Sequence, residues 1–159
     1  MQLTIRPTLP TDTNHLKNIL NTIELFPEEM LNEMIADYLN NQATEQIWFT
    51  AVADKVPVGF GYCAPEMLTE GTYNLYAIGV KANLQGNGIG GQMISYLEDQ
   101  LKKKGHRVLI VETSSGTNFS LTRKFYENLG YQKEAVIRDF WSEGEDKVVY
   151  WKKLNLRKK

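Results

Sequence analysis

The sequence has 159 residues, 42% of them hydrophobic and 23% charged, and its formal net charge is −1. These values fit one soluble globular domain over residues 1–159. A net charge so close to zero argues against nucleic acid as a partner, and only residues 156–159 are locally basic. Because no apolar run is long enough to span a bilayer and no leader pattern opens the chain, we expect a cytoplasmic protein with no membrane partner.

The sequence contains one cysteine and two histidines, which restricts disulfide and metal chemistry. Cys63 has no second cysteine to pair with and no His or Asp in a motif around it, so we expect a small packed residue in a strand. His15 and His106 lie far apart in the sequence and lack the spacing of metal ligands. We therefore expect no metal.

The first half of the chain predicts a strand, two helices and a hairpin. Residues 2–6 alternate polar and apolar side chains, as a strand does. Apolar residues at helical spacing then predict two helices, and a short link over about residues 21–26 joins them. The apolar faces of these helices are Leu16, Ile19, Leu20 and Ile23, then Leu31, Met34, Ile35, Tyr38 and Leu39. Two apolar runs at 46–53 and 57–64 predict the hairpin.

The second half predicts alternating strands and helices, followed by a second hairpin. The expected elements are a strand at 73–80, a helix at 89–104, a strand at 107–113, a helix at 118–129 and strands at 131–140 and 147–154. Because the strand at 107–113 follows a helix, we expect it to run parallel to the strand at 73–80.

A glycine-rich loop, Gln85-Gly86-Asn87-Gly88-Ile89-Gly90-Gly91, lies between a predicted strand and a predicted helix. The first amides of a helix have no intrahelical acceptor, and glycines let a ligand approach the backbone. This arrangement predicts a phosphate-binding loop, with a flexible connector as the alternative. A P-loop is excluded because Gly-Lys-Ser/Thr is absent. A dinucleotide fold is not supported, because only one strand-like run follows before the next helix.

Three motifs resemble the GNAT superfamily of N-acetyltransferases. The glycine loop resembles the family's acyl-CoA site, and Phe125-Tyr126-Glu-Asn-Leu-Gly130-Tyr131, with Asn118 opening the helix, resembles its second signature. The opening Ile5–Asp12 is similar to the family's first strand and helix cap. The resemblance spans almost the whole chain. It implies an α/β (α+β) fold, with a mixed sheet of about seven strands, about four helices and a central parallel pair splayed apart to admit acyl-CoA.

The resemblance implies an acetyl-CoA-dependent N-acetyltransferase, an acyltransferase without a metal. In such an enzyme a primary amine attacks acetyl-CoA directly in a ternary complex. The acceptor is a small molecule or a protein amine, and the sequence does not separate these. Nor does it determine the acyl-chain preference or the oligomeric state, although a homodimer is compatible with it. A non-catalytic acyl-CoA-binding sensor or regulatory domain is the alternative.

The resemblance also implies site residues. The expected acyl-CoA contacts are Ile78, Gly79, Val80, Gln85, Gly86, Asn87, Gly88, Ile89, Gly90, Gly91, Asn118 and Tyr126. Backbone amides near Gly79 would bind the oxyanion, unless that glycine serves packing alone. Tyr126 would protonate the departing thiolate, with an aromatic packing role as the alternative. Leu121, Phe125 and Leu129 are expected to face the core.

The general base and the acceptor pocket are less defined. Some relatives place a glutamate on the fourth strand where this chain has Asn74, which cannot act as a base. Glu112 is the best nearby carboxylate, either as a base or as a structural hydrogen-bond acceptor, while proton transfer through water to bulk solvent needs no residue. By resemblance, the acceptor pocket lies between the first helix–helix link and the last hairpin. The acidic and aromatic side chains of these regions suit a cationic amine, and they are Glu24, Phe26, Asp139, Phe140, Trp141, Glu143, Glu145 and Asp146. Asn74 is a further candidate.

Overall fold

The computed structural model describes residues 1–154, so the basic residues 156–159 lie outside the described part. In this described part, seven strands form one mixed sheet in the order β1-β2-β3-β4-β5-β7-β6, and four α-helices accompany them; the numbers of strands and helices are those predicted. The chain divides into two compact units, residues 1–64 with 76–97 and residues 65–75 with those from 98 onward. That residues 1–159 form a single domain stays a prediction, because the division into two units does not test it.

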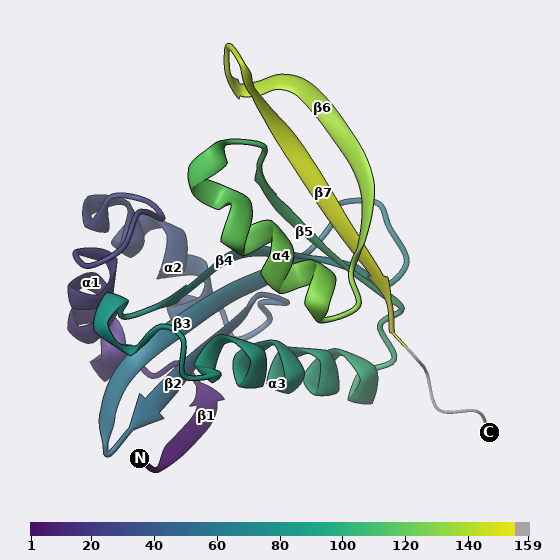
Figure 1. The fold of residues 1–159 in the computed structure, drawn as a ribbon. Helices are drawn as coiled ribbons and strands as arrows, with labels where there is room; N and C mark the ends of the chain where they lie inside the picture. The colour runs from purple at the N-terminus through teal and green to yellow at the C-terminus, as the bar shows by residue number, and fades with distance from the viewer. Residues whose placement is uncertain (155–159) are drawn as a thin grey trace. The chain divides into compact units, whose positions relative to one another are not determined.

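The first unit contains the amino-terminal strands and helices (Figure 1). Its elements are β1 (Leu3–Pro7), α1 (Thr13–Leu20), α2 (Leu31–Asn40), β2 (Ile47–Ala53) and β3 (Val56–Pro65), whose last residue belongs to the other unit. β1 and β3 each pair antiparallel with β2. Helix α1 ends at Leu20, so Ile23 lies in the link between α1 and α2 and not in the helix as its spacing suggests.

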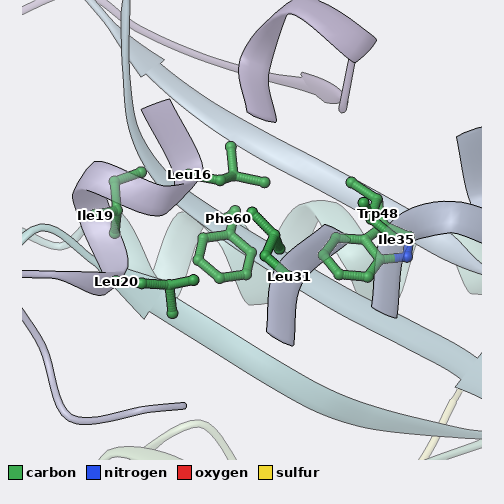
Figure 2. Close-up of a cluster of buried hydrophobic side chains, with 7 residues drawn as sticks. All are labelled: Leu16, Ile19, Leu20, Leu31, Ile35, Trp48 and Phe60. Atoms are coloured by element: carbon green, nitrogen blue, oxygen red, sulfur yellow. The ribbon is translucent and has the colours of Figure 1, made fainter. Parts of the chain in front are cut away.

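The core of this unit lies where α1 and α2 meet β2 and β3 (Figure 2). Its buried side chains are Leu16, Ile19 and Leu20 of α1, Leu31 and Ile35 of α2, Trp48 of β2 and Phe60 of β3. Each such burial contributes roughly 1.5–3 kcal/mol to folding, which holds both helices against the sheet. On β3, Cys63 is fully buried as predicted, and burial raises the pKa of its thiol.

The second unit contains β5 (Val108–Ser114), α4 (Ser120–Asn128), β6 (Gln132–Ser142) and β7 (Glu145–Lys153). β5 and β6 each pair antiparallel with β7. The β6–β7 hairpin, yellow-green to yellow in Figure 1, has longer strands and a tighter turn than predicted. Gly144 supplies the positive φ of 82° that this turn requires.

Besides β3, two elements contribute residues to both units. They are β4 (Thr72–Val80) and α3 (Ile89–Lys103). β4 and β5 run parallel, as predicted, in a register that pairs Thr72 with Val108 and Leu75 with Val111. A splay of their carboxyl-terminal halves stays a prediction.

The buried face of α4 differs from the predicted one. Leu121 is 80% exposed, whereas Tyr126 is only 3% exposed. The two residues are five positions apart, which places them about 140° apart around the helix. Since Tyr126 packs against Tyr131 and Tyr150, Leu121 is turned toward solvent and the prediction that it faces the core is wrong.

Candidate functional site

The glycine loop adopts a conformation that depends on glycine at two positions. Gly86 and Gly88 have φ values of 83° and 80°, and a Cβ atom at either residue would meet nothing within 4 Å. Backbone conformation, and not crowding by neighbouring protein atoms, therefore requires glycine here. The open space around both residues leaves room for a ligand to approach the backbone.

Helix α3 begins directly at the end of this loop. The N–H of Gln92 donates to the Gly88 carbonyl over 3.2 Å and forms the first turn of the helix. The N–H groups of residues 89–91 therefore lie in a first turn, where no intrahelical acceptor exists. Together with the helix dipole, these N–H groups suit the negative charge of a diphosphate.

Two polar side chains of the loop bind the backbone nearby. Gln85 Nε2 donates to the Val80 carbonyl over 3.0 Å, and Asn87 Nδ2 donates to the Leu84 carbonyl over 3.0 Å. These bonds fix the loop to the end of β4 and to the short 3-10 helix Ala82–Leu84. Both side chains thus shape the loop, while its backbone amides remain the groups suited to an anion.

Gly79 in β4 is a place of close approach, as its occurrence within a strand predicts. A Cβ atom there would overlap the Ile23 side chain, and Leu25 Cδ2 would lie only 3.4 Å away. The packing of the α1–α2 link against the strand therefore explains this glycine. An oxyanion-binding role for the amides of Ile78, Gly79 and Val80 stays a prediction.

A shallow pocket of about 520 Å³ is formed by the α1–α2 link. Leu20, Asn21, Ile23, Glu24, Leu25, Phe26, Pro27, Glu28 and Glu29 line it. Glu24 and Phe26, both predicted to contact the acceptor, are among these residues. Phe26 also makes an edge-on contact with Phe60 at a centroid distance of 6.3 Å, which anchors the pocket to the core.

The pocket and the glycine loop belong to the same unit and are tied together. Thr22 Oγ1, in the α1–α2 link, accepts a hydrogen bond over 3.1 Å from the N–H of Ala82, shortly before the loop. Ile23 of the same link packs against Gly79. The first unit thus places the link residues beside the end of β4 from which the loop departs.

In the second unit, Tyr126 is surrounded by aromatic rings. The ring centroids of Phe125, Tyr131 and Tyr150 lie 5.1, 5.8 and 5.9 Å from that of Tyr126. Burial raises the pKa of Tyr126, so its hydroxyl stays protonated well into the alkaline range. Within residues 1–154 this hydroxyl makes no hydrogen bond. The residue packs as the alternative reading expects, and it also retains a proton to donate.

Asn118 lies in a 3-10 turn, Thr117–Phe119, directly before α4. Arg123 stabilises the preceding loop, because its Nη1 donates to the carbonyls of Ser114 and Gly116 over 2.7 and 2.8 Å. The Asn118 side chain is exposed, so the predicted contact with acyl-CoA is sterically open to it.

Glu112 is half-buried and paired with a cation. Lys147 Nζ lies 3.1 Å from its Oε2 and 4.0 Å from the centroid of the Phe140 ring. The ion pair agrees with the structural role that the sequence left open for Glu112, and its catalytic role stays a prediction.

The two hairpin residues predicted to contact the acceptor have structural partners. Asp139 Oδ1 accepts a hydrogen bond from the N–H of Gly144 over 2.9 Å, which closes the turn. Trp141 Nε1 donates to the Thr113 carbonyl over 3.2 Å, which attaches β6 to the end of β5. These contacts fix the tip of the hairpin, and a role in acceptor binding stays a prediction for both residues.

Asn74 is 1% exposed and has a hydrogen-bond partner that the sequence does not predict. Its Nδ2 donates to Oε1 of Glu66 over 2.8 Å, while its Oδ1 is buried without a hydrogen-bond partner. Both residues belong to the second unit.

Within residues 1–154, no group of three His, Cys, Asp or Glu side chains is arranged to hold a metal ion.

A sequence profile of the acetyltransferase (GNAT) family matches residues 13–131, which is most of the chain. The chain belongs to the GNAT family. The match includes the glycine loop and the Tyr126 motif, two of the three segments that carry the sequence resemblance, whereas Ile5–Asp12 precedes it.

Two further comparisons agree with this GNAT assignment. A crystal structure from Desulfovibrio desulfuricans, assigned to the same family as a candidate acetyltransferase, matches with a TM-score of 0.90 and 27% identity. The match covers 97% of this chain and 100% of that one. An uncharacterized N-acetyltransferase of Bacillus subtilis, YsnE, is 31% identical over 67 residues, which are 42% of this chain and 44% of that protein. The aligned segment thus spans less than half of the curated relative.

More distant solved structures share the fold of this GNAT chain. The ribosomal-protein-S18-alanine N-acetyltransferase of Escherichia coli matches with a TM-score of 0.80, 20% identity and coverage of 99% and 97%. An aminoglycoside 6′-N-acetyltransferase complexed with coenzyme A matches with a TM-score of 0.79, 20% identity and coverage of 98% and 99%. In the described part of the GNAT chain, no helix is long and apolar enough to cross a membrane.

Sequence reasoning missed several residues that shape the GNAT site. Thr22 binds Ala82 just after β4, and Ile23 packs against Gly79 of β4. Lys147 engages Glu112, and Glu66 binds Asn74. No local pattern marks these residues, because each acts on a partner distant in sequence or across a loop. An asparagine within a buried strand is the one sequence signal that indicates a polar partner, because buried amide groups normally form hydrogen bonds.

Proposed function

We propose that this GNAT chain transfers an acetyl group from acetyl-CoA to a primary amine, which attacks the thioester directly in a ternary complex. The supporting observation is the glycine loop. It combines open positive-φ glycines with the first-turn amides of α3, an arrangement suited to the diphosphate of acetyl-CoA. Family membership supports acetyl transfer as the reaction.

Each chemical demand of the reaction has a candidate group. Amides in the stretch from Ile78 to Val80 would stabilise the oxyanion, and Tyr126, whose hydroxyl stays protonated, would donate a proton to the departing thiolate. A primary amine with a pKa of about 10.4 is almost fully protonated at neutral pH, so it must lose a proton before it attacks. Glu112, or water leading to bulk solvent, would take that proton.

The pocket at the α1–α2 link supports a cationic acceptor. Glu24, Glu28 and Glu29 surround it with negative charge, and Phe26 adds an aromatic face. Carboxylates attract an ammonium group, and an aromatic ring stabilises one through a cation–π interaction. We propose that the acceptor amine is presented on a small cationic molecule or on a protein segment.

A thiol-release assay tests the proposal. Purified protein is mixed with acetyl-CoA and each of four amines: spermidine, kanamycin, a peptide with an amino-terminal alanine and an acetyl-capped peptide with an internal lysine. We expect thiol release that depends on at least one amine, and binding of coenzyme A by titration calorimetry. Binding without release for any amine would favour the sensor, and no binding of coenzyme A would reject both functions.

A further inference from the structure

Strand β6 is unusually exposed for part of a sheet. All 11 of its residues, Gln132–Ser142, are exposed, although a strand of an antiparallel sheet commonly packs one face on the core. Its apolar side chains include Val136, which is 51% exposed, and Ile137, which is 44% exposed. Neither face of β6 is therefore buried within residues 1–154.

The backbone along one side of β6 is also open. In the sheet order β6 is a terminal strand, and its one neighbour in the described part of the chain is β7 (Figure 1). Every second residue of such an edge strand directs its N–H and C=O away from the sheet. An edge that combines these groups with exposed apolar side chains is a place where another strand can pair.

Two features of β6 limit which strand can pair there. Its pairing with β7 is irregular beside Glu134 and beyond Ile137, and Asp139 has a φ of 55°, which ends the extended stretch at Arg138. Glu134 and Arg138 place charges on the edge. Bulges and edge charges are means by which proteins prevent indiscriminate pairing. A strand that pairs with β6 must therefore be short and must match these charges.

The charges of β6 match a second copy of β6. Glu134 and Arg138 lie two residues on either side of Val136. If two copies pair antiparallel about a two-fold axis at Val136, Glu134 of each copy faces Arg138 of the other. Opposite charges directly across two antiparallel strands stabilise the pair. Neither side chain has a hydrogen bond or an ion pair within residues 1–154, so both are available to a partner.

The residues between the two charges suit the same alignment. They are Ala135, Val136 and Ile137, so apolar side chains occupy the centre of the pair. Ala135 of each copy faces Ile137 of the other, which sets a small side chain against a large one. The alignment thus buries the exposed apolar side chains at the axis and places an ion pair at each end.

We propose that β6 is a dimer interface, on which a second copy of this chain pairs antiparallel through its own β6. A strand with another order of charges would leave Glu134 and Arg138 facing like charges or none, so the edge favours its own copy over other strands. One strand from each copy makes a small interface, so the dimer exchanges with the monomer. The proposal does not depend on the acetyltransferase function.

Sedimentation velocity of the purified protein between about 1 and 500 μM tests the proposal. We expect the wild type to form a dimer as its concentration rises. Glu134→Arg and Arg138→Glu each set like charges against one another twice across the axis, so each should raise the dissociation constant of the dimer by about 10-fold or more. Asp99→Arg makes the same change of charge at an exposed residue of α3 and should leave the dimer unchanged.

Mixing the two charge-reversed variants gives a stricter test. Glu134→Arg has two positive charges at positions 134 and 138, and Arg138→Glu has two negative ones, so a mixed pair brings opposite charges together at both ends. We expect an equimolar mixture to form dimers at concentrations at which each variant alone is monomeric. The double variant Glu134→Arg with Arg138→Glu exchanges the two charges and should dimerise as the wild type does.

Hydrogen exchange locates the interface, because the amides of residues 134–138 should exchange more slowly in concentrated than in dilute wild-type protein. A wild type that remains monomeric up to about 500 μM would overturn the proposal and leave the edge to a different partner. A dimer insensitive to both charge reversals would overturn it as well, since it would use another surface. If either charge-reversed variant does not fold, Val136→Lys decides, because it sets two like charges at the axis and should weaken the dimer by about 10-fold.

Discussion

Thr22 Oγ1 accepts a hydrogen bond over 3.1 Å from the backbone N–H of Ala82, which joins the α1–α2 link to the segment leading into the glycine loop. Because the link lines the pocket proposed for the acceptor, this bond couples the shape of the pocket to the segment that follows β4. We expect Thr22→Val, which keeps the shape but removes the oxygen, to lower the free energy of unfolding by about 1 kcal/mol.

The same variant should also raise the KM for the amine by several-fold, because the pocket loses an anchor. Thr13→Val is the control, since the Thr13 hydroxyl at the start of α1 donates to the Pro10 carbonyl, far from the pocket in sequence. Steady-state kinetics and thermal melting measure both effects. An unchanged KM in Thr22→Val would contradict the coupling.

The backbone conformation at Gly88 is expected to control the binding of acetyl-CoA. Gly88→Ala places a side chain on a residue with a φ of 80°, which costs about 1–2 kcal/mol and favours a changed loop. We expect the dissociation constant for coenzyme A to rise by at least about 10-fold.

Gly105→Ala is the matched control for that change. Gly105 has a φ of 81°, and a Cβ atom there also meets nothing within 4 Å, but it follows the other end of α3. The Gly105→Ala variant should lose a similar free energy of unfolding, and it should bind coenzyme A as the wild type does. Equal loss of binding in both variants would show that the loop has no special role.

The Tyr126 hydroxyl is expected to serve catalysis more than stability. Tyr126→Phe should reduce kcat by about 100-fold or more, the usual size of a general-acid effect. It should change the free energy of unfolding by less than about 1 kcal/mol, since no hydrogen bond of the described residues is lost.

Tyr150→Phe is the matched control, because Tyr150 OH donates to Oε2 of Glu127 over 2.8 Å. That variant should lose about 1 kcal/mol of stability and retain kcat. Chemical denaturation and thiol release separate the two effects. A Tyr126→Phe enzyme with normal kcat would assign the residue to packing alone.

The pH dependence of turnover follows from the raised pKa of Tyr126. Burial is the cause, and it favours the neutral phenol, so the proposed general acid keeps its proton above pH 10, where an exposed tyrosine loses it. Rates should rise from pH 6 to pH 9 as the amine loses its proton, with no fall caused by Tyr126. A decline in kcat with a midpoint below about pH 10 that is absent from Tyr126→Phe would contradict this expectation.

The pair between Arg6 and Asp12 predicts how stability depends on acid. Burial alone would raise the pKa of Asp12, but hydrogen bonds from Arg6, at 2.7 Å, and from the Leu9 N–H outweigh it and lower the pKa. A lowered pKa means that the unfolded chain takes up the proton first. The stabilisation that the Arg6–Asp12 pair gives the folded protein is therefore complete above about pH 4. It is lost as the pH falls through the lower pKa that Asp12 has in the folded protein.

We expect Asp12→Asn to lower the free energy of unfolding by about 1–3 kcal/mol at pH 7 and to flatten its decline below pH 4. Asp99→Asn, at an exposed residue of α3, should do neither. Urea denaturation at a series of pH values provides the measurement. An unchanged acid profile in Asp12→Asn would contradict the role of the pair.

Local patterns predicted much of the fold. The apolar residues at helical spacing, the alternating strands and the glycines that end helices are short-range signals, so the element order and the parallel β4–β5 pair could be predicted. Leu121 shows where such reasoning fails. Its apolar character suggested burial, but the aromatic neighbours of Tyr126 fix the rotation of α4 and leave Leu121 exposed.

The sequence by itself determined the glycine loop at the start of a helix, since conformational freedom and helix-end amides are properties of consecutive residues. Only the tertiary structure decided what contacts the candidate residues. It paired Glu112 with Lys147, placed Ile23 against Gly79 and joined Glu66 to Asn74. The physical reason is that hydrogen bonds and ion pairs act over a few ångströms of space, whatever the separation of the partners along the chain.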